Sequence, residues 1–251
     1  HDGQQFLADQ YASATIPSLS VSQAILKRRD RKNSRILAMG LTESVGGFSA
    51  LPAVETEVAT ITEQVLTGSF FLNQPFTVGN LQSQRGQAKY GIIHLATHAR
   101  FTSSEEEGAF IQFWDRRLNI KAIGELGLDD PTVEMLTLSA CQTAVGESLG
   151  LGGLAIKKGV KTVLASLWPV EDAGTAPLMI NFYSKWEDSR SKAIALREAQ
   201  QSILAGTVRI EDGQVLGIPG LSDITLPEQE AEINLAHPYY WSSFILVGNW
   251  L

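Results

Sequence analysis

The sequence predicts an α/β fold in which a mostly parallel central sheet carries helices on both faces. Three observations support this prediction. Short apolar runs typical of buried strands alternate with segments of helical spacing. Clusters of Gly, Ser, Pro or Asp end these segments, as expected for loops between elements. Hydrophobic residues make up 44% of the 251 residues, which is enough for a large packed core.

The first half of the chain contains three predicted strands and one helix. Residues 35–41 (RILAMGL) form a short apolar run that ends in a Ser/Gly-rich loop. A helix is predicted over 51–65, where apolar residues recur at helical spacing, namely Val54, Val58, Ile61 and Val65. Strands are predicted over 90–98 and 132–140, and the segment 116–131 between them alternates loosely before a turn.

The second half continues the alternation. A helix over 149–159 ends at Gly159, and a strand follows over 160–168. Two helices come next, over 172–186 and 189–206, and the last strand covers 242–250. Residues 205–237 are polar and rich in Gly and Pro, so they are predicted to be an insertion loop.

Charge and cysteine content exclude several classes of function. The net charge of -7 argues against a nucleic-acid binder and fits a cationic substrate or partner better. Cys141 is the only cysteine, so neither an internal disulfide nor a CxxC metal site is possible, and a cytoplasmic, reducing location is expected. No apolar run approaches the ~20 residues that span a bilayer, and no signal peptide is recognisable. The start without Met leads us to expect a fragment of a longer protein.

The stretch GIIHLATHAR contains His94 and His98, four residues apart. On a strand these residues are ~13 Å apart, which is too far for two ligands at ~2.1 Å from one metal ion. We therefore expect no metal site. His94 is surrounded by apolar residues and is expected in the core. His98 stands at the carboxyl end of its strand, where chemistry gathers in α/β sheets, so a core role and a catalytic role both stay open.

Cys141 ends the strand predicted over 132–140 and lies 43 residues after His98. If the two strands are neighbours, the thiol and the imidazole converge. An imidazole near a thiol lowers the pKa of the thiol or accepts its proton, which activates the sulfur as a nucleophile. The alternative for Cys141 is a small buried hydrophobic residue.

Six segments in order resemble the CHAT domain, a bacterial and archaeal relative of caspases and separases that is often joined to tetratricopeptide repeats. They are HLATHARF, LTLSACQTAVGE, GLAIKKGVKTVLASLWPVEDAGT, FYSKW, KAIALREAQ and HPYYWSSFILVGNW. The resemblance implies a caspase-like three-layer fold and one N-terminally truncated protease domain over 1–251. Residues 1–50 would hold the end of a degenerate first half-domain or a first strand region.

The same resemblance implies a cysteine endopeptidase that needs no cofactor and acts on protein substrates. His98 matches the catalytic histidine, Cys141 the nucleophile, and His94 a non-catalytic position. Ala99 replaces the Gly that usually follows the catalytic histidine. Its backbone N–H and that of Cys141 would form the oxyanion hole. The partners implied are an upstream tetratricopeptide-repeat region or another regulatory protein, with no nucleic acid and no membrane.

Asp172 matches the separase residue that lines the pocket for the side chain before the cleaved bond. A carboxylate at that place binds Arg better than Lys, because guanidinium offers a planar fork of donors. Asp172 is also well placed as the N-cap of the helix over 172–186, and the two roles are compatible. The acidic run over 103–108 (SSEEEG) is expected to be a solvated loop or, alternatively, to hold basic residues flanking the cut.

Two other functions stay open. GLGGLA, followed by Glu171, loosely matches a dinucleotide-binding motif, but its glycines fall inside a predicted helix rather than in a strand-to-helix turn. The second is a non-catalytic interaction module regulated by partner repeats. Ala99 in place of Gly and the missing upstream region keep this alternative open.

Overall fold

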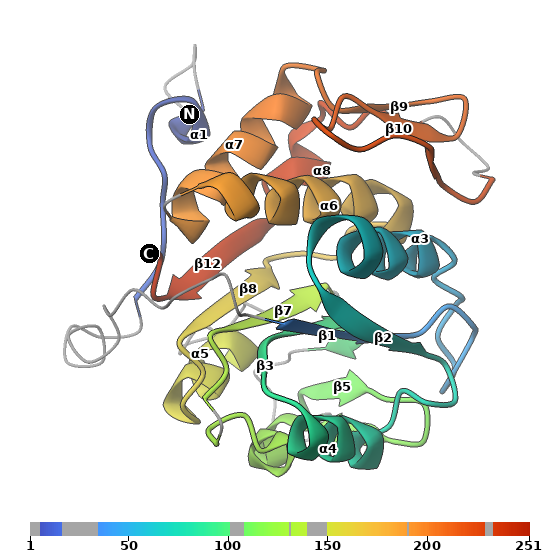
Figure 1. Ribbon diagram of the computed structural model, residues 1–251, viewed down its shortest axis with the longest axis vertical. Coiled ribbons are helices and arrows are strands. Elements are labelled where there is room, and N and C mark those ends of the chain that lie inside the picture. The colour runs from blue at the N-terminus through green and yellow to red at the C-terminus, as the bar shows by residue number, and fades with distance from the viewer. Residues whose placement is uncertain are drawn as a thin grey trace.

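The computed structural model describes residues 6–16, 35–100, 108–130, 132–139, 150–189, 191–228 and 233–251. The central sheet has six strands in the order β12-β8-β7-β3-β1-β2. Its strands are β1 (Arg35–Gly40), β2 (Gly68–Leu72), β3 (Tyr90–Ala96), β7 (Met135–Ser139), β8 (Thr162–Ser166) and β12 (Phe244–Gly248). All neighbours pair in parallel except β8 and β12. The predicted fold class is therefore confirmed (Figure 1).

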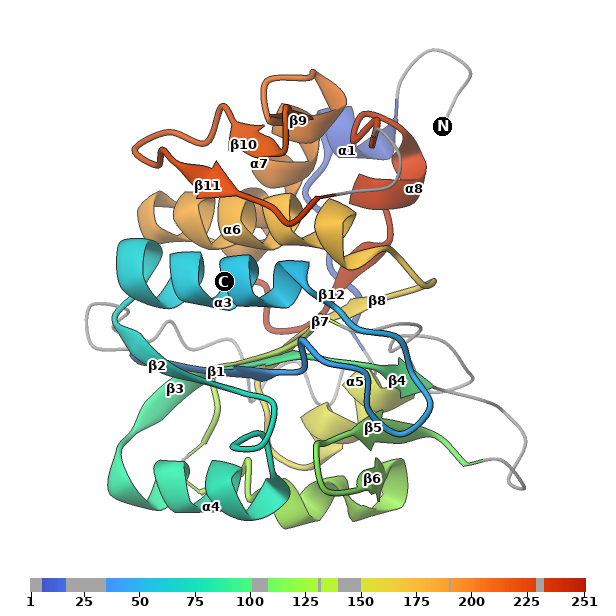
Figure 2. The same ribbon diagram turned by 90° about the vertical axis from the view of Figure 1, so that its right-hand side faces the viewer.

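Helices cover both faces of the sheet, as Figure 2 shows. One face carries α3 (Ala53–Thr60), which continues into a π-helical turn (Ile61–Val65), with α6 (Asp172–Asp188), α7 (Lys192–Leu204) and α8 (Pro238–Trp241). The other carries α4 (Val78–Gln87), a 3₁₀ helix (Ile120–Leu126) and α5 (Gly150–Lys157). Helix α1 (Leu7–Gln10) lies against α7. Among the described helices, none is long and apolar enough to cross a bilayer.

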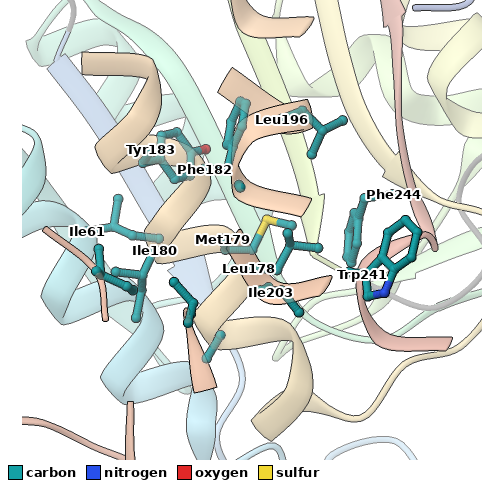
Figure 3. Packing of buried hydrophobic residues seen from close by; sticks show 14 of the residues in the cluster. Ile61, Leu178, Met179, Ile180, Phe182, Tyr183, Leu196, Ile203, Trp241 and Phe244 are labelled. Carbon is teal, nitrogen blue, oxygen red and sulfur yellow. The ribbon is translucent and has the colours of Figure 1, made fainter. Parts of the chain in front are cut away.

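The continuous apolar runs of the sequence arise because both faces of each inner strand are buried. Along β1, Leu37 and Met39 pack into the core under α4 and α5, while Ile36 packs into the core of α6 and α7. Successive strand side chains point to opposite faces, so burial on both faces needs apolar residues at every position. Figure 3 shows the α6–α7 core, with Leu178, Met179 and other large side chains in contact.

Two small antiparallel sheets lie outside the central sheet. One contains β4 (Ala99–Arg100), β5 (Phe110–Gln112) and β6 (Arg117–Asn119); the other contains β9 (Arg209–Glu211), β10 (Gln214–Leu216) and β11 (Ile224–Thr225). The second falls in the segment predicted to be an insertion loop. Asp212 and Gly213 both have positive φ there, which is the Asp-Gly hairpin turn of type I′. The segment is therefore not a loop throughout. Its Gly and polar residues form a turn between strands, and Val215 and Ile224 are buried.

Strand β2 and helix α4 were not predicted from the sequence. Helix α4 contains Gly79 and Gly86 and is mostly polar, with only Val78, Leu81 and Arg85 buried. Its start is nevertheless marked by Thr77, whose hydroxyl accepts a hydrogen bond from the backbone N–H of Asn80.

Candidate active site

A narrow cavity opens at the carboxyl ends of three neighbouring parallel strands, β3, β7 and β8. It measures about 20 Å³, which is room for about one water molecule. Among the described residues, eleven line it: Leu51, Val54, Glu57, Thr97, His98, Ser139, Ser166, Val170, Asp172, Thr175 and Phe244. The cavity therefore lies where α/β sheets place their functional groups.

The pairing of β3 with β7 brings the ends of the histidine strand and the cysteine strand together. Ala96 lies opposite Ser139 in the parallel register, and the backbone N–H of Thr97 donates to the carbonyl of Ser139 at 3.1 Å. The two strands are therefore neighbours, which the sequence alone had left as a condition. His98 comes two residues after Ala96, and Cys141 comes two residues after Ser139 in the sequence. Cys141 itself lies outside the described residues.

His98 is half-buried and held by a backbone carbonyl and an aromatic ring. Its Nε2 lies 2.8 Å from the carbonyl oxygen of Ser49, and its ring stacks on Phe48 with centroids 4.6 Å apart and planes at 16°. Because a carbonyl can only accept a hydrogen bond, Nε2 carries the hydrogen. Nδ1 of the neutral ring is then unprotonated, so it can accept a proton.

The loop that presents Ser49 and Phe48, residues 41–52, is fixed at its base and at its tip. At the base, the Asn73 side chain accepts the N–H of Thr42 at 2.8 Å and donates to the Thr42 hydroxyl at 2.7 Å. At the tip, the Arg117 guanidinium donates to the carbonyl of Gly46 at 2.7 Å and lies 5.4 Å from the centre of the Phe48 ring. The positive φ of 63° at Gly46 provides the turn between these two anchors.

The environment of His98 favours its neutral form. Burial disfavours the charged imidazolium and lowers the pKa of His98 below its ordinary value of 6.5. The hydrogen bond to Ser49 and the negative charge of Asp172 act in the opposite direction but do not cancel the effect of burial. At neutral pH the imidazole is thus a base rather than a cation.

His94 lies in the core, as predicted, rather than in the cavity. It is fully buried, its Nε2 lies 2.8 Å from Oε1 of Glu57, and its Nδ1 lies 3.2 Å from the hydroxyl of Tyr183. That hydroxyl lies 2.7 Å from Oγ1 of Thr137 on β7. Burial raises the pKa of Tyr183 well above its usual range, so the hydroxyl keeps its proton.

Asp172 lines the cavity, but the helix that it caps is a different one from the predicted helix. Glu171 occupies the N-cap position of α6, and Asp172 is the first residue inside that helix. Its Oδ2 accepts a hydrogen bond of 2.8 Å from the backbone N–H of Ala53, the first residue of α3. The first N–H groups of a helix lack partners within it, so a carboxylate from a neighbouring helix can satisfy one. The prediction that Asp172 caps its own helix is wrong.

The backbone of Ala99 leaves its N–H outside the β4–β5 ladder. Ala99 is not among the described residues with positive φ, so no steric cost attaches to its methyl group. Gln112 N–H donates to the carbonyl of His98 at 2.8 Å, and Ala99 lies opposite Ile111 in the next pair. Hydrogen-bonded and non-hydrogen-bonded pairs alternate in an antiparallel ladder, so the N–H of Ala99 points away from β5 and is not used in the ladder.

The glycine-rich motif lies within α5, inside a helix as the sequence predicts, rather than in a strand-to-helix turn. A methyl group on Gly152 would make an ordinary van der Waals contact with Val163 of β8 at 3.6 Å, so this helix lies against the sheet. The acidic run over 103–108 lies outside the described residues except for Gly108. In the described part of the chain, no cluster of three or more His, Cys, Asp or Glu residues is arranged to bind a metal ion.

Sequence reasoning did not identify Ser49, Phe48, Glu57 or Arg117. Ser49 acts through its backbone carbonyl, which leaves no side-chain signal. Glu57 had a signal: it lies between Val54, Val58 and Ile61 on the apolar face of the predicted helix and is 1% exposed. A carboxylate on that face has to enter the core, where it is stable only beside a partner.

Comparisons with known proteins agree with this architecture. A protein-family model described as CHAT domain matches residues 1–249. No curated protein matches the chain by sequence. Among solved structures, the complex of the Porphyromonas gingivalis RgpB pro- and mature domains has a TM-score of 0.53 at 9% identity over 86% of this chain and 47% of that one. The Arg specific cysteine proteinase gingipain R has the same score and identity over 92% and 50%. This chain therefore spans about half the length of those structures, and the likeness concerns the fold.

We expect the His98 ring to titrate below pH 6.5. Since its pKa is lower in the folded chain than in the unfolded chain, the unfolded chain binds more protons at acidic pH. The contribution of His98 to stability is therefore present above pH 6.5 and is lost as the pH falls through its folded pKa. NMR titration of the ring measures the midpoint, and a midpoint at or above 6.5 contradicts the burial described here.

Arg117→Ala should move the His98 midpoint upward, toward 6.5. Without the guanidinium, Phe48 and the carbonyl of Gly46 lose their anchor, and water reaches the imidazole. Arg116→Ala is the matched control, because Arg116 is half exposed and pairs with Glu125 instead. Equal NMR midpoints in both variants would show that Arg117 does not hold the loop against His98.

Proposed function

Since this chain belongs to the CHAT domain family, we propose that it is a cysteine endopeptidase in which His98 and Cys141 form the catalytic dyad. The observation that carries the proposal is the parallel register of β3 and β7. Ala96 and Ser139 are paired, and in the sequence His98 and Cys141 each come two residues after one of them. A thiol there would reach a carbonyl bound in the cavity beside the imidazole.

The reaction proceeds in two steps. His98 accepts the thiol proton, and the Cys141 thiolate attacks the carbonyl carbon of the peptide bond. The C–N bond breaks, a thioester forms, and the imidazolium gives its proton to the leaving amine. A water molecule then gives a proton to His98 and attacks the thioester, which releases the carboxyl product and restores the thiol.

Two structural features would support these steps. The carbonyl of Ser49 holds the Nε2–H of His98, which leaves Nδ1 as the atom that exchanges protons. This carbonyl does the work of the third member of a triad, which orients the base. The N–H groups of Ala99 and Cys141 are the candidates for binding the oxyanion, and losing one such donor costs ~3 kcal/mol in comparable enzymes.

The substrate residue before the cut is proposed to be basic, with Arg preferred over Lys. Asp172 lies in the cavity next to His98, and its charge already acts on that ring. Its Oδ2 binds the N–H of Ala53, so Oδ1 is the oxygen that would face a guanidinium. One of the two similar structures is that of an Arg specific cysteine proteinase, which agrees with this preference.

A non-catalytic interaction module is the second candidate. The cavity in the present structure holds about one water molecule, so its walls have to separate before an arginine side chain can enter. A cavity this narrow would suit a chain that binds its partners without turnover. It would equally suit a protease whose cavity is opened by a regulatory partner. We propose a tetratricopeptide-repeat protein or segment as this partner, and the reducing cytoplasm as the location that keeps the Cys141 thiol free.

Labelling tests the dyad. An arginyl chloromethyl ketone should alkylate Cys141, and mass spectrometry should locate the adduct there. Cys141→Ala should abolish both labelling and peptide cleavage, and His98→Ala should slow cleavage by ~10²–10⁴-fold, as for loss of a general base. His237→Ala is the matched control, since His237 is not among the residues lining the cavity. Cleavage that survives Cys141→Ala would refute the proposal.

A peptide panel tests the specificity. We expect cleavage after Arg to exceed cleavage after Lys, with little after Leu or Asp. Asp172→Asn keeps an acceptor for the N–H of Ala53 but removes the charge. It should lower kcat/KM for the Arg peptide, which corresponds to a loss of about 1.5–3 kcal/mol of transition-state stabilisation. Asp188→Asn, at the exposed end of the same helix, is the control. A wild-type chain without preference for basic residues would exclude the pocket.

A further inference from the structure

Glu57 carries a carboxylate in the interior of the protein. It is 1% exposed, whereas Glu55 on the same helix is exposed to solvent. An ionised carboxylate is costly to bury unless charge and hydrogen bonds compensate it. The question is therefore what this carboxylate is for.

The neighbours of Glu57 leave it incompletely paired. Oε1 lies 2.8 Å from Nε2 of His94, but neither carboxylate oxygen accepts a well-aligned hydrogen bond from the described residues. His94 is in turn linked to Tyr183 and Thr137, so its other ring nitrogen is already used. Oε2 of Glu57 is left as a buried acceptor without a donor among these residues. Buried polar atoms without a hydrogen-bond partner are rare in native proteins and call for an explanation.

The position of Glu57 explains why its carboxylate is incompletely paired, because Glu57 lines the same cavity as His98 and Asp172. Asp172 binds the N–H of Ala53, and Glu57 comes four residues after Ala53 on α3. Asp172 thus contacts α3 at its first residue, Glu57 follows about one helical turn later, and both residues line the cavity. No Lys or Arg is among the described residues that line the cavity. The described lining thus presents two carboxylates and no permanent cation.

We propose that Glu57 is a second specificity-determining residue of the substrate pocket, which binds the cationic side chain before the cleaved bond together with Asp172. This inference rests on the proposed function and extends it. A guanidinium has five N–H donors in a planar fork and can contact two carboxylates at once, whereas an ammonium is a compact charge. Once the walls of the cavity separate, the guanidinium would supply the donor that Oε2 lacks.

Glu57→Gln tests the proposal, because the amide keeps the shape and an acceptor for His94 but removes the charge. Glu55→Gln is the matched control: it removes the same charge from the same helix at an exposed position. The substrates are a peptide with Arg before the cut and one with citrulline, the uncharged counterpart of Arg. We expect Glu57→Gln to lower kcat/KM for the Arg peptide about tenfold or more, mainly through KM. The citrulline peptide and the control variant should change little.

Thermal unfolding separates a binding role from a structural one. If Glu57 serves the substrate, its charge lacks full compensation in the free protein, and Glu57→Gln should unfold at the same or a higher temperature than wild type. If Glu57 only anchors His94, the variant should unfold at a lower temperature and lose activity equally toward both peptides. An unchanged ratio of Arg to citrulline cleavage overturns the proposal.

Failure of the proposed function can be recognised separately. If wild type cleaves none of the peptides, the endopeptidase proposal fails. Calorimetry with the Arg peptide then compares Cys141→Ala with the double variant Cys141→Ala, Glu57→Gln. An increase of about tenfold or more in Kd supports a pocket containing Glu57, and an equal Kd, or no binding by either variant, refutes it.

Discussion

The parallel pairing of β3 with β7 is the constraint on which the candidate site depends. Slipping the register by one residue would turn every side chain of β3 to the opposite face of the sheet. Ile93 and Leu95 are buried on the α4–α5 face, while His94 faces Glu57 and Tyr183 on the other. Apolar and polar partners on the two faces therefore fix the register, and the register fixes how far His98 lies beyond the sheet edge.

Strands and helices that pack on the central sheet could be predicted from the sequence, because burial on one or both faces leaves an apolar pattern. β3, β7 and β8 fall within their predicted ranges, and so does the long helix α3 with its π-helical turn. Elements whose stability comes from other sources could not be predicted. Helix α4 starts at a hydroxyl cap, and the β9–β10 hairpin turns at Asp212 and Gly213, so both depend on local hydrogen bonds and backbone geometry.

The site divides in the same way. His98 could be located because a titratable side chain stood at the end of an apolar run. The contacts that hold the site could not be found this way. Ser49 contributes only a backbone carbonyl, and Asp172 caps a helix 119 residues away in the chain. Such contacts depend on how segments meet in space, and a single sequence carries no record of them.

The loop containing Ser49 continues directly into α3, and this continuity has a mechanical consequence. The first turn of α3 is tied to α6 through Asp172, and the hydroxyl of Thr56 donates to the carbonyl of Thr225 on β11. Helix α3 therefore joins the loop that holds the imidazole to α6 and to the outer β9–β11 sheet. A shift of α3 relative to the central sheet would move the carbonyl of Ser49, which contacts His98.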